Sequence, residues 1–352
     1  MKIILIGDNY YRRTYDPLVY LGYNITLIRY NFKVSKFVQP FMYFYKIIQT
    51  FFYTFVFNPD IVIITNPSYI SFFTIDFFRL MKRKSFMRIG ADLKNDFHLA
   101  LECYSRNYIK KYLKYMQKIM CEYSIKKVDI ILTSSEFVKA EIRKGYCIFN
   151  KNIYSVYSPV SRIDNPIKFD SRKNIILSVT QFNNPYKIKG LQDSIYNLSS
   201  WLRKNTDYKY VIIGGGKNFE NTVAWFKENF SLDNVEFLGY KENVSDWYKI
   251  SKLFLHISYR DGFPKVVLEA QSEGLPVIVN NDVGMREQVV HGYNGFLIDN
   301  NNLNQLTEYV DEILKNEKLW QKLSHNCFKY VERKFSLNEI SKKIKIALEN
   351  FN

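Results

Sequence analysis

The sequence has no long uninterrupted hydrophobic run, no internal repeat and no low-complexity tail. Its amino-terminal apolar stretch, within MKIILIGDNYYRR, is too short for a signal peptide and predicts a first β-strand instead. The aromatic stretch PFMYFYKIIQTFFYTFVF, residues 40–57, is too short and too often interrupted by polar residues for a membrane-spanning helix. We therefore expect a cytoplasmic protein.

Cysteine is also scarce, with four residues in a chain of 352. Their positions follow neither the spacing of metal ligands nor the paired framework of a disulfide-rich domain. We expect free thiols in a reducing compartment. The four are Cys103, Cys121, Cys147 and Cys327.

Apolar residues, by contrast, are plentiful. Hydrophobic residues make up 47% of the chain and charged residues 24%, a balance typical of a globular protein and not of a disordered one. A length of 352 residues favours two domains of ordinary size, each able to bury its own core.

Positive charge is abundant and unevenly distributed. Residues 1–170 carry 26 Lys and Arg against 13 Asp and Glu, a net charge of +13 out of +16 for the whole chain. Such a field attracts anionic lipids, nucleic acids or acidic glycans. Because no nucleic-acid-binding motif accompanies it, we expect an anionic membrane surface as a partner, and no nucleic acid.

The stretch Leu253–Ile298 organises the second half of the chain. Leu253–Ser258 is an apolar run that predicts a strand. Pro264 fits the first position of a helix over Lys265–Glu273, where its missing N–H costs nothing, and Pro276–Val279 predicts the next strand. This order is typical of a βαβ unit in a parallel sheet. Its helix N-terminus lies at the ligand-binding end of the strands and favours an anion.

Two carboxylates flank this predicted helix. Asp261 precedes it, and Glu269 follows eight residues later, roughly 7 Å below the helix start at about 1.5 Å per residue. Carboxylates bind vicinal hydroxyls because each oxygen accepts a hydrogen bond. With a diphosphate at the helix N-terminus, Asp261 would lie beside its sugar end and Glu269 beside a ribose. An ordinary Rossmann-type unit with a surface Asp and Glu is the alternative.

The pattern Asp261-Gly-Phe-Pro-Lys-Val-Val-Leu-Glu269-Ala, followed by Gly274-Leu-Pro-Val, resembles the second half of glycosyltransferase family 4. Members of that family carry a carboxylate, seven residues and then a Glu. Here the first carboxylate is Asp, where the family usually has Glu. The downstream spacing Gly284…Glu287…Gly292…Gly295-Phe-Leu also fits.

The resemblance implies the α/β GT-B fold, with two Rossmann-like domains whose parallel sheets face a central cleft. We expect an acceptor-binding domain over residues 1–168 and a nucleotide-sugar-binding domain over residues 169–336. A final helix, residues 337–352, is expected to cross back to the first domain.

The resemblance also implies individual roles in donor binding. Lys189, in the family's Lys-Gly pair, would hold the donor phosphates, with Lys187 nearby as an assisting cation. Gln181 stands where the family often has an arginine. Asp261 would position the sugar hydroxyls, and Glu269 the ribose. Further donor-binding residues are expected at Gly215, Tyr240, Gly262, Phe263, Pro264, Lys265 and Val266, where the amides of residues 263, 265 and 266 would contact phosphate.

In the first half, four residues are candidates for acceptor binding. Arg12 and Arg13 follow the first predicted strand, and Asp92 and His98 follow a strand predicted over Phe86–Ile89. Solvated loop arginines and a structural histidine are the alternatives.

Two predicted helices bear on the membrane. Residues 40–57 either pack between the sheet and its neighbours or expose an apolar face to lipid. Residues 102–127 form one long helix whose lysine-rich face is either simply solvated or contacts an anionic surface. The four lysines on that face are Lys110, Lys111, Lys114 and Lys118.

These features predict a retaining hexosyltransferase that moves a sugar from a nucleoside-diphosphate sugar to a glycan or lipid-linked acceptor at the cytoplasmic membrane surface. By the resemblance it needs no metal and no cofactor beyond the donor. A weak or inactive nucleotide- or glycan-binding relative and a membrane-interaction module remain as alternatives.

Overall fold

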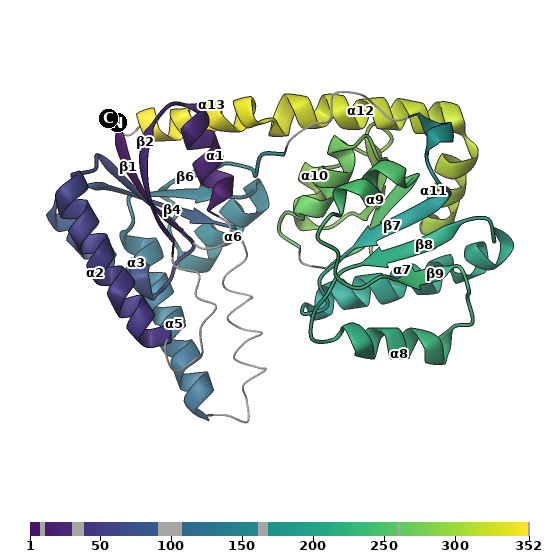
Figure 1. Cartoon of the computed structure of the whole chain (residues 1–352), viewed down its shortest axis with the longest axis horizontal. Coiled ribbons are helices and arrows are strands. Elements are labelled where there is room, and N and C mark those ends of the chain that lie inside the picture. The colour runs from purple at the N-terminus through teal and green to yellow at the C-terminus, as the bar shows by residue number, and fades with distance from the viewer. Residues whose placement is uncertain (8–10, 30–38, 91–107, 161–167, 260, 351–352) are drawn as a thin grey trace. The chain divides into compact units, whose positions relative to one another are not determined.

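A computed structural model describes residues 1–7, 11–29, 39–90, 108–160, 168–259 and 261–350 (Figure 1). The chain forms two compact units. Unit 1 comprises Met1–Pro159 and Leu337–Asn352, and unit 2 comprises Val160–Ser336. Each unit contains a six-stranded sheet whose paired strands are parallel. The α/β class with two parallel sheets, predicted from the sequence, is confirmed.

The sheet of unit 1 has the order β2-β1-β3-β4-β5-β6. Several of its strands read as continuous apolar runs, because helices cover both faces of a parallel sheet. Ile61–Thr65 is an example in which all five residues are buried. The strands are β1 (Lys2–Gly7), β2 (Asn24–Arg29), β3 (Ile61–Thr65), β4 (Lys84–Ile89), β5 (Ile130–Thr133) and β6 (Asn152–Ser155).

The helices of unit 1 divide between the two faces of this sheet. They are α1 (Arg12–Tyr20), α2 (Gln39–Phe57), α3 (Tyr69–Leu80), α5 (Tyr108–Lys127), α6 (Glu136–Tyr146) and α13 (Leu337–Glu349). Ile4 and Ile6 belong to a core with residues of α2, α3, α5 and α6, whereas Ile3 and Leu5 belong to a core with residues of α1 and α13. Among the described helices, none is long and apolar enough to cross a bilayer.

The sheet of unit 2 has the order β12-β11-β10-β7-β8-β9. Its strands are β7 (Ile175–Val179), β8 (Lys209–Ile213), β9 (Val235–Phe237), β10 (Leu253–His256), β11 (Val277–Asn280) and β12 (Gly295–Ile298). Its helices are α7 (Pro185–Lys204), α8 (Phe219–Asn229), α9 (Ser245–Ile250), α10 (Lys265–Ser272), α11 (Gln305–Lys315) and α12 (Glu317–Phe335), with short 3-10 turns at Phe169–Ser171 and Val283–Glu287. The predicted βαβ unit is β10, α10 and β11.

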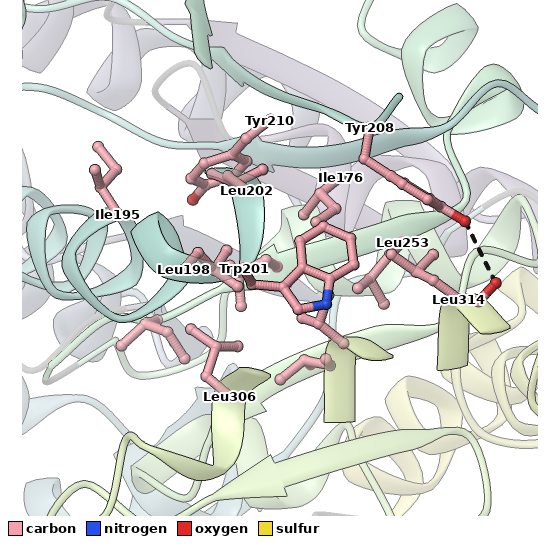
Figure 2. Packing of buried hydrophobic residues seen from close by; sticks show 14 of the residues in the cluster. Ile176, Ile195, Leu198, Trp201, Leu202, Tyr208, Tyr210, Leu253, Leu306 and Leu314 are labelled. Atoms are coloured by element: carbon pink, nitrogen blue, oxygen red, sulfur yellow. Dashed lines mark hydrogen bonds between the residues drawn. The ribbon is translucent and has the colours of Figure 1, made fainter. Parts of the chain in front are cut away.

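A hydrophobic cluster of mostly aliphatic residues around a few aromatic rings fills the core between α7, α11 and the sheet of unit 2 (Figure 2). Trp201 packs edge-on against Tyr208 at 5.2 Å and donates a hydrogen bond to Asp311 at 2.9 Å. The hydroxyl of Tyr208 donates to the carbonyl oxygen of Leu314 at 3.4 Å. The polar atoms of these two rings are therefore hydrogen-bonded, so the rings bury apolar surface without leaving an unsatisfied donor.

The last helix, α13, forms part of the core of unit 1. Ile340, Ile344, Ala347 and Leu348 are buried against the sheet, and the hydroxyl of Ser341 donates to the Pro17 carbonyl at 3.3 Å. The end of the chain therefore stabilises the unit in which the chain begins.

Replacing Ile344 with Ala is expected to destabilise unit 1 by about 2–5 kcal/mol, because the side chain is fully buried. The four tryptophans of the chain, Trp201, Trp225, Trp247 and Trp320, all belong to unit 2. In denaturant titrations, the midpoint of unfolding of unit 1, followed by circular dichroism, should therefore move to a lower denaturant concentration. The midpoint of the tryptophan fluorescence transition, which reports on unit 2, should not change. Ile346→Ala, at a position of α13 that is 52% exposed, serves as the control. Equal effects of the two substitutions would contradict the packing.

Candidate active site

Helix α7 begins at the carboxyl end of β7 and carries two lysines in its first two turns. The side-chain oxygen of Asn184 accepts hydrogen bonds from the N–H groups of Tyr186 and Lys187, and Pro185 occupies the first helical position. A helix N-terminus bears a partial positive charge. Lys187 and Lys189 therefore add formal charge to a place that already favours an anion.

A glycine allows α7 to touch the end of the neighbouring strand β10. A Cβ atom at residue 190 would lie 2.0 Å from the carbonyl oxygen of Ile257. Any residue other than Gly190 would thus push the helix away from the strand. Since β7 and β10 pair directly, the contact brings the start of α7 to the loop that follows β10.

The clearest consequence is an ion pair between Lys187 and Asp261. The Nζ of Lys187 lies 2.8 Å from Oδ2 of Asp261, and both side chains are mostly buried. Burial by itself would raise the pKa of Asp261, but the charge of Lys187 and the contact with His256 outweigh it and hold that pKa well below its usual value. Asp261 is therefore a carboxylate at neutral pH.

His256 lies beneath this ion pair at the end of β10. Its ring is buried and stacks on Phe254 at 6.2 Å between centroids, and its Nε2 lies 3.7 Å from Oδ2 of Asp261. Burial lowers the pKa of His256 in spite of the neighbouring carboxylate, which raises it. The imidazole is therefore neutral at pH 7.

Lys189 has a different partner from Lys187. Its side chain is 64% exposed, and its Nζ lies 2.6 Å from Oδ1 of Asp193, one turn further along α7. The other oxygen of Asp193 accepts a hydrogen bond from the hydroxyl of Tyr259 at 2.9 Å. Asp193 thus joins α7 to the loop after β10, and Lys189 reaches solvent beside this junction.

The segment before α10 is held by its neighbours. The sequence predicted Pro264 at the first helical position, but Pro264 is the N-cap, with an extended ψ of 113°, and the helix begins at Lys265. The side-chain amide of Gln288 donates to the Pro264 carbonyl at 2.9 Å. A Cβ at Gly284 would lie 1.8 Å from the Gly262 carbonyl oxygen. The backbone that presents the first amides of α10 is therefore tightly packed.

Glu269 lies in the second turn of α10 and is oriented by two contacts. Its Oε1 is 3.1 Å from the Nζ of Lys265, and its Oε2 accepts a hydrogen bond from the hydroxyl of Tyr248 at 3.3 Å. The side chain remains partly exposed. It can therefore accept hydrogen bonds from a ligand that contacts the same helix.

The loops after β7, β8 and β9 meet at the same edge of the sheet. The N–H of Phe182 donates to the carbonyl oxygen of Gly215 at 3.1 Å, and a Cβ at Gly215 would lie 3.2 Å from the Cβ of Tyr240. The ring of Tyr240 is exposed, as is the side chain of Gln181. Two of the expected donor-binding residues, Gly215 and Tyr240, are thus neighbours.

The expected acceptor-binding residues belong to unit 1. Arg12 and Arg13 are the first two residues of α1 and not part of a loop. Arg12 is exposed and Arg13 is partly exposed. Asp92 and His98 lie outside the described residues.

Residues 160–332, nearly the whole of unit 2, match the family described as glycosyl transferases group 1. The chain belongs to this family. It is 28% identical over 236 residues to an uncharacterized glycosyltransferase of Haemophilus influenzae, an alignment that covers 64% of this chain and 63% of that protein. It is 29% identical over 142 residues, 40% of this chain and 36% of the relative, to an Escherichia coli UDP-Gal:alpha-D-GlcNAc-diphosphoundecaprenol alpha-1,3-galactosyltransferase.

Each of these two alignments spans less than two thirds of the curated relative. The fold similarity extends further. The crystal structure of Anabaena HepE in complex with UDP has a TM-score of 0.72, with 13% sequence identity over 99% of this chain and 100% of that one. This likeness identifies the fold as GT-B, as the sequence predicted.

Sequence reasoning about this group 1 glycosyl transferase missed His256 and gave Lys187 only a subsidiary place. A signal for His256 exists: it is a lone polar residue that interrupts the apolar run LFLHI just before the loop. Lys187 carries no such signal, because its partnership with Asp261 spans 74 residues of sequence and depends on how α7 meets β10.

The free energy of unfolding of unit 2 is expected to fall as the pH decreases from 7 to 5. The folded-state pKa of His256 lies below its unfolded value of about 6.5, so the unfolded state binds the proton more readily in this window. The loss is at most about 1.4 kcal/mol per pH unit for one proton. Asp261 does not contribute here, because its pKa is lowered and its stabilisation is lost only below about pH 4.

Denaturant titrations followed by tryptophan fluorescence at several pH values measure this slope. His256→Asn should flatten it. His325→Asn, at an exposed position of α12, should leave it as in the wild type. An unchanged slope in His256→Asn would show that His256 does not titrate in this range.

Proposed function

We propose that this chain transfers a hexose, with retention at the anomeric carbon, from a nucleoside-diphosphate sugar to a glycan or lipid-linked acceptor at the cytoplasmic face of a membrane. One arrangement carries the proposal. Helices α7 and α10 start at the same edge of the sheet, and a lysine of one is paired with the carboxylate that precedes the other. Two helix N-termini and their lysines favour a diphosphate, and a carboxylate beside them favours sugar hydroxyls.

The donor diphosphate is proposed to bind Lys189 and the backbone amides of Phe263, Lys265 and Val266. The first N–H groups of a helix have no partner within it, so those of α10 can donate hydrogen bonds to a phosphate oxygen. Charge on the diphosphate increases as the glycosidic bond breaks. A cation and fixed amides beside the leaving group therefore stabilise the transition state more than the bound donor.

The two carboxylates are proposed to bind opposite ends of the donor. Asp261 is ionised and held in place, which suits it to accept hydrogen bonds from sugar hydroxyls. Glu269, one turn into α10, is assigned to the ribose, and Gly215 and Tyr240 to the nucleoside. Lys187 supplies a cation at the edge where Gln181 replaces the arginine that such enzymes often carry.

In this mechanism the acceptor attacks the face of the sugar from which the diphosphate leaves, and the departing phosphate oxygen takes the acceptor proton. The cations and amides of unit 2 supply the positive charge that the leaving group requires. The proposal therefore includes no metal ion.

A lipid-linked acceptor is favoured by two observations. The named substrate of the Escherichia coli relative is a diphosphoundecaprenol-linked sugar. Residues 1–170 of this chain carry a net charge of +13, and α5 bears four lysines between residues 110 and 118. A basic half suits an anionic membrane or a diphosphate-linked lipid. Arg12, Arg13, Asp92 and His98 remain proposed acceptor contacts.

The function is tested by incubating the protein with a panel of nucleotide sugars and a polyprenyl-diphosphate-linked acceptor and determining the anomeric configuration of any product by NMR. We expect transfer with retention. Glu269→Gln keeps the side chain's shape but removes its charge, and should weaken donor binding by a few-fold to about 100-fold, or roughly 1–3 kcal/mol. Binding of the nucleotide without transfer or hydrolysis would favour the inactive relative instead. Unchanged affinity and rate in Glu269→Gln would refute the assigned role.

The two lysines of α7 are expected to differ in kinetic effect. Lys189→Ala should lower kcat by about 100-fold or more, because the lysine acts on the leaving diphosphate. Lys187→Ala should instead raise the pKa of Asp261 by removing its cation, so the loss of activity should grow toward acidic pH. pH profiles of kcat and kcat/KM for both variants provide the measurement. Full activity of Lys189→Ala with loss in Lys187→Ala at all pH values would assign the phosphate contact to Lys187.

A further inference from the structure

Helix α2 exposes an apolar stripe along its whole length. Its members recur at steps of three and four residues, which places them on one face of a helix. Their exposed fractions run from 50% at Ile48 to 72% at Phe41 and Phe55. We call this face the α2 stripe, made of Phe41, Phe44, Tyr45, Ile48, Phe52, Phe55 and Val56.

The opposite face of α2 turns polar groups toward the protein. Thr50 and Thr54 are fully buried, and their hydroxyls donate to the carbonyl oxygens of Lys46 and Thr50, both at 2.7 Å. Bonds to the preceding turn let a threonine be buried without an outside partner. Tyr43 and Ile47 complete this inner face. The helix thus departs from the usual amphipathic arrangement, because apolar side chains cover its outer face as well as much of its inner face.

The helices beside α2 continue the exposed apolar surface. The ring of Phe51 in α2 packs against Phe77 of α3 at 4.5 Å, and Ser71 of α3 donates to Ser124 of α5 at 3.1 Å. The three helices therefore lie side by side, in the order α2, α3 and α5, on one side of the sheet of unit 1 (Figure 1). Exposed apolar residues of α3 and α5 are Phe73, Leu80, Tyr108, Ile109, Tyr112, Leu113, Tyr115 and Ile119.

The charge on this surface has one sign over α2 and most of α5. Residues 39–57 contain a single charged residue, Lys46, and residues 108–121 contain four lysines and no acid. An exposed apolar surface of this extent marks an interaction site. Its basic border would repel the same border of a second copy and attract an anionic surface. The chemistry therefore fits a bilayer with anionic lipids.

We propose that the α2 stripe inserts into the interfacial region of an anionic membrane, with the lysines of α5 at the headgroups. This inference extends the proposed function. It rests on that function only in assuming that the acceptor lies at the membrane. An amphipathic helix lying in the membrane plane buries its aromatic side chains at the boundary between headgroups and acyl chains, while nearby lysines contact lipid phosphate. Apolar burial makes part of the binding resistant to salt, whereas the lysine part is screened.

The test uses the full chain and vesicles of phosphatidylcholine and phosphatidylglycerol in equal amounts. The variant Phe44→Glu/Phe52→Glu/Phe55→Glu changes three exposed positions, and Glu is a better helix former than Phe, so α2 should stay folded. We expect its vesicle affinity to fall by about 100-fold or more, because three aromatic side chains no longer enter the membrane. Lys110→Gln/Lys111→Gln/Lys114→Gln/Lys118→Gln should lose only the salt-sensitive part.

A matched control adds the same charge elsewhere on unit 1. Val19, Tyr20 and Ile346 are exposed apolar residues of α1 and α13, which cover the other face of the sheet. Val19→Glu/Tyr20→Glu/Ile346→Glu should bind vesicles far better than the stripe variant. Equal losses in both variants would mean that added negative charge alone causes the effect, and would overturn the proposal.

Insertion itself is measured with a tryptophan placed in the stripe. All native tryptophans belong to unit 2. Phe52→Trp should therefore add a fluorescence component that vesicles with brominated acyl chains quench. Tyr196→Trp, at an exposed aromatic position of α7 in unit 2, should add one that they do not quench. Absence of quenching at residue 52 would overturn insertion.

Two further outcomes would refute the proposal. One is a wild-type protein that stays in the supernatant with these vesicles at low salt. The other is a lipid-free dimer that the three-glutamate stripe variant converts to a monomer, which would assign the stripe to a second copy of the chain. Transfer to a water-soluble acceptor, assayed in parallel, separates the two proposals. Vesicle binding without any transfer would refute only the proposed function, and transfer without binding only the membrane inference.

Discussion

The close contact between Gly190 and the backbone at Ile257 is the constraint on which the candidate site depends. With 2.0 Å between a hypothetical Cβ and the Ile257 carbonyl oxygen, only a glycine allows α7 to meet the end of β10. That approach places Lys187 against Asp261 and brings Asp193 to Tyr259. A backbone contact that excludes side chains thus determines which charges become partners.

The charged residues of the candidate site have different kinds of partner in its buried part and in its exposed part. Beneath the surface, one carboxylate lies between a lysine and a neutral histidine, and burial strengthens the attraction between the charged pair. Nearer to solvent, Lys189 and Glu269 have partners on their own helices, which a ligand can replace at small cost because exposed ion pairs contribute little. The site therefore combines a fixed carboxylate with a lysine and a second carboxylate that remain accessible.

Much of the fold followed from local pattern. Apolar runs such as Ile61–Thr65 predicted the buried strands, and the order of strand, helix and strand from Leu253 onward predicted the βαβ unit, because backbone geometry and burial impose these periods on any sequence. The spacing of Asp261 and Glu269 also predicted one carboxylate in the loop before a helix and one within that helix. For α2 the sequence predicted a helix with a narrow polar stripe, and could not tell whether that stripe faces water or the protein.

The sequence by itself therefore determined the strands, the helices, the class of fold and the helix that carries Glu269 and follows Asp261, since these depend on residues near one another in the chain. Only the tertiary structure decided that Asp261 pairs with Lys187 and that His256 lies beneath it. It also decided that α2 buries Thr50 and Thr54 while the phenylalanines of the α2 stripe face outward. These outcomes depend on contacts between distant segments. Packing selects such contacts by shape and by the free energy of burying charge, and neither quantity is visible in local spacing.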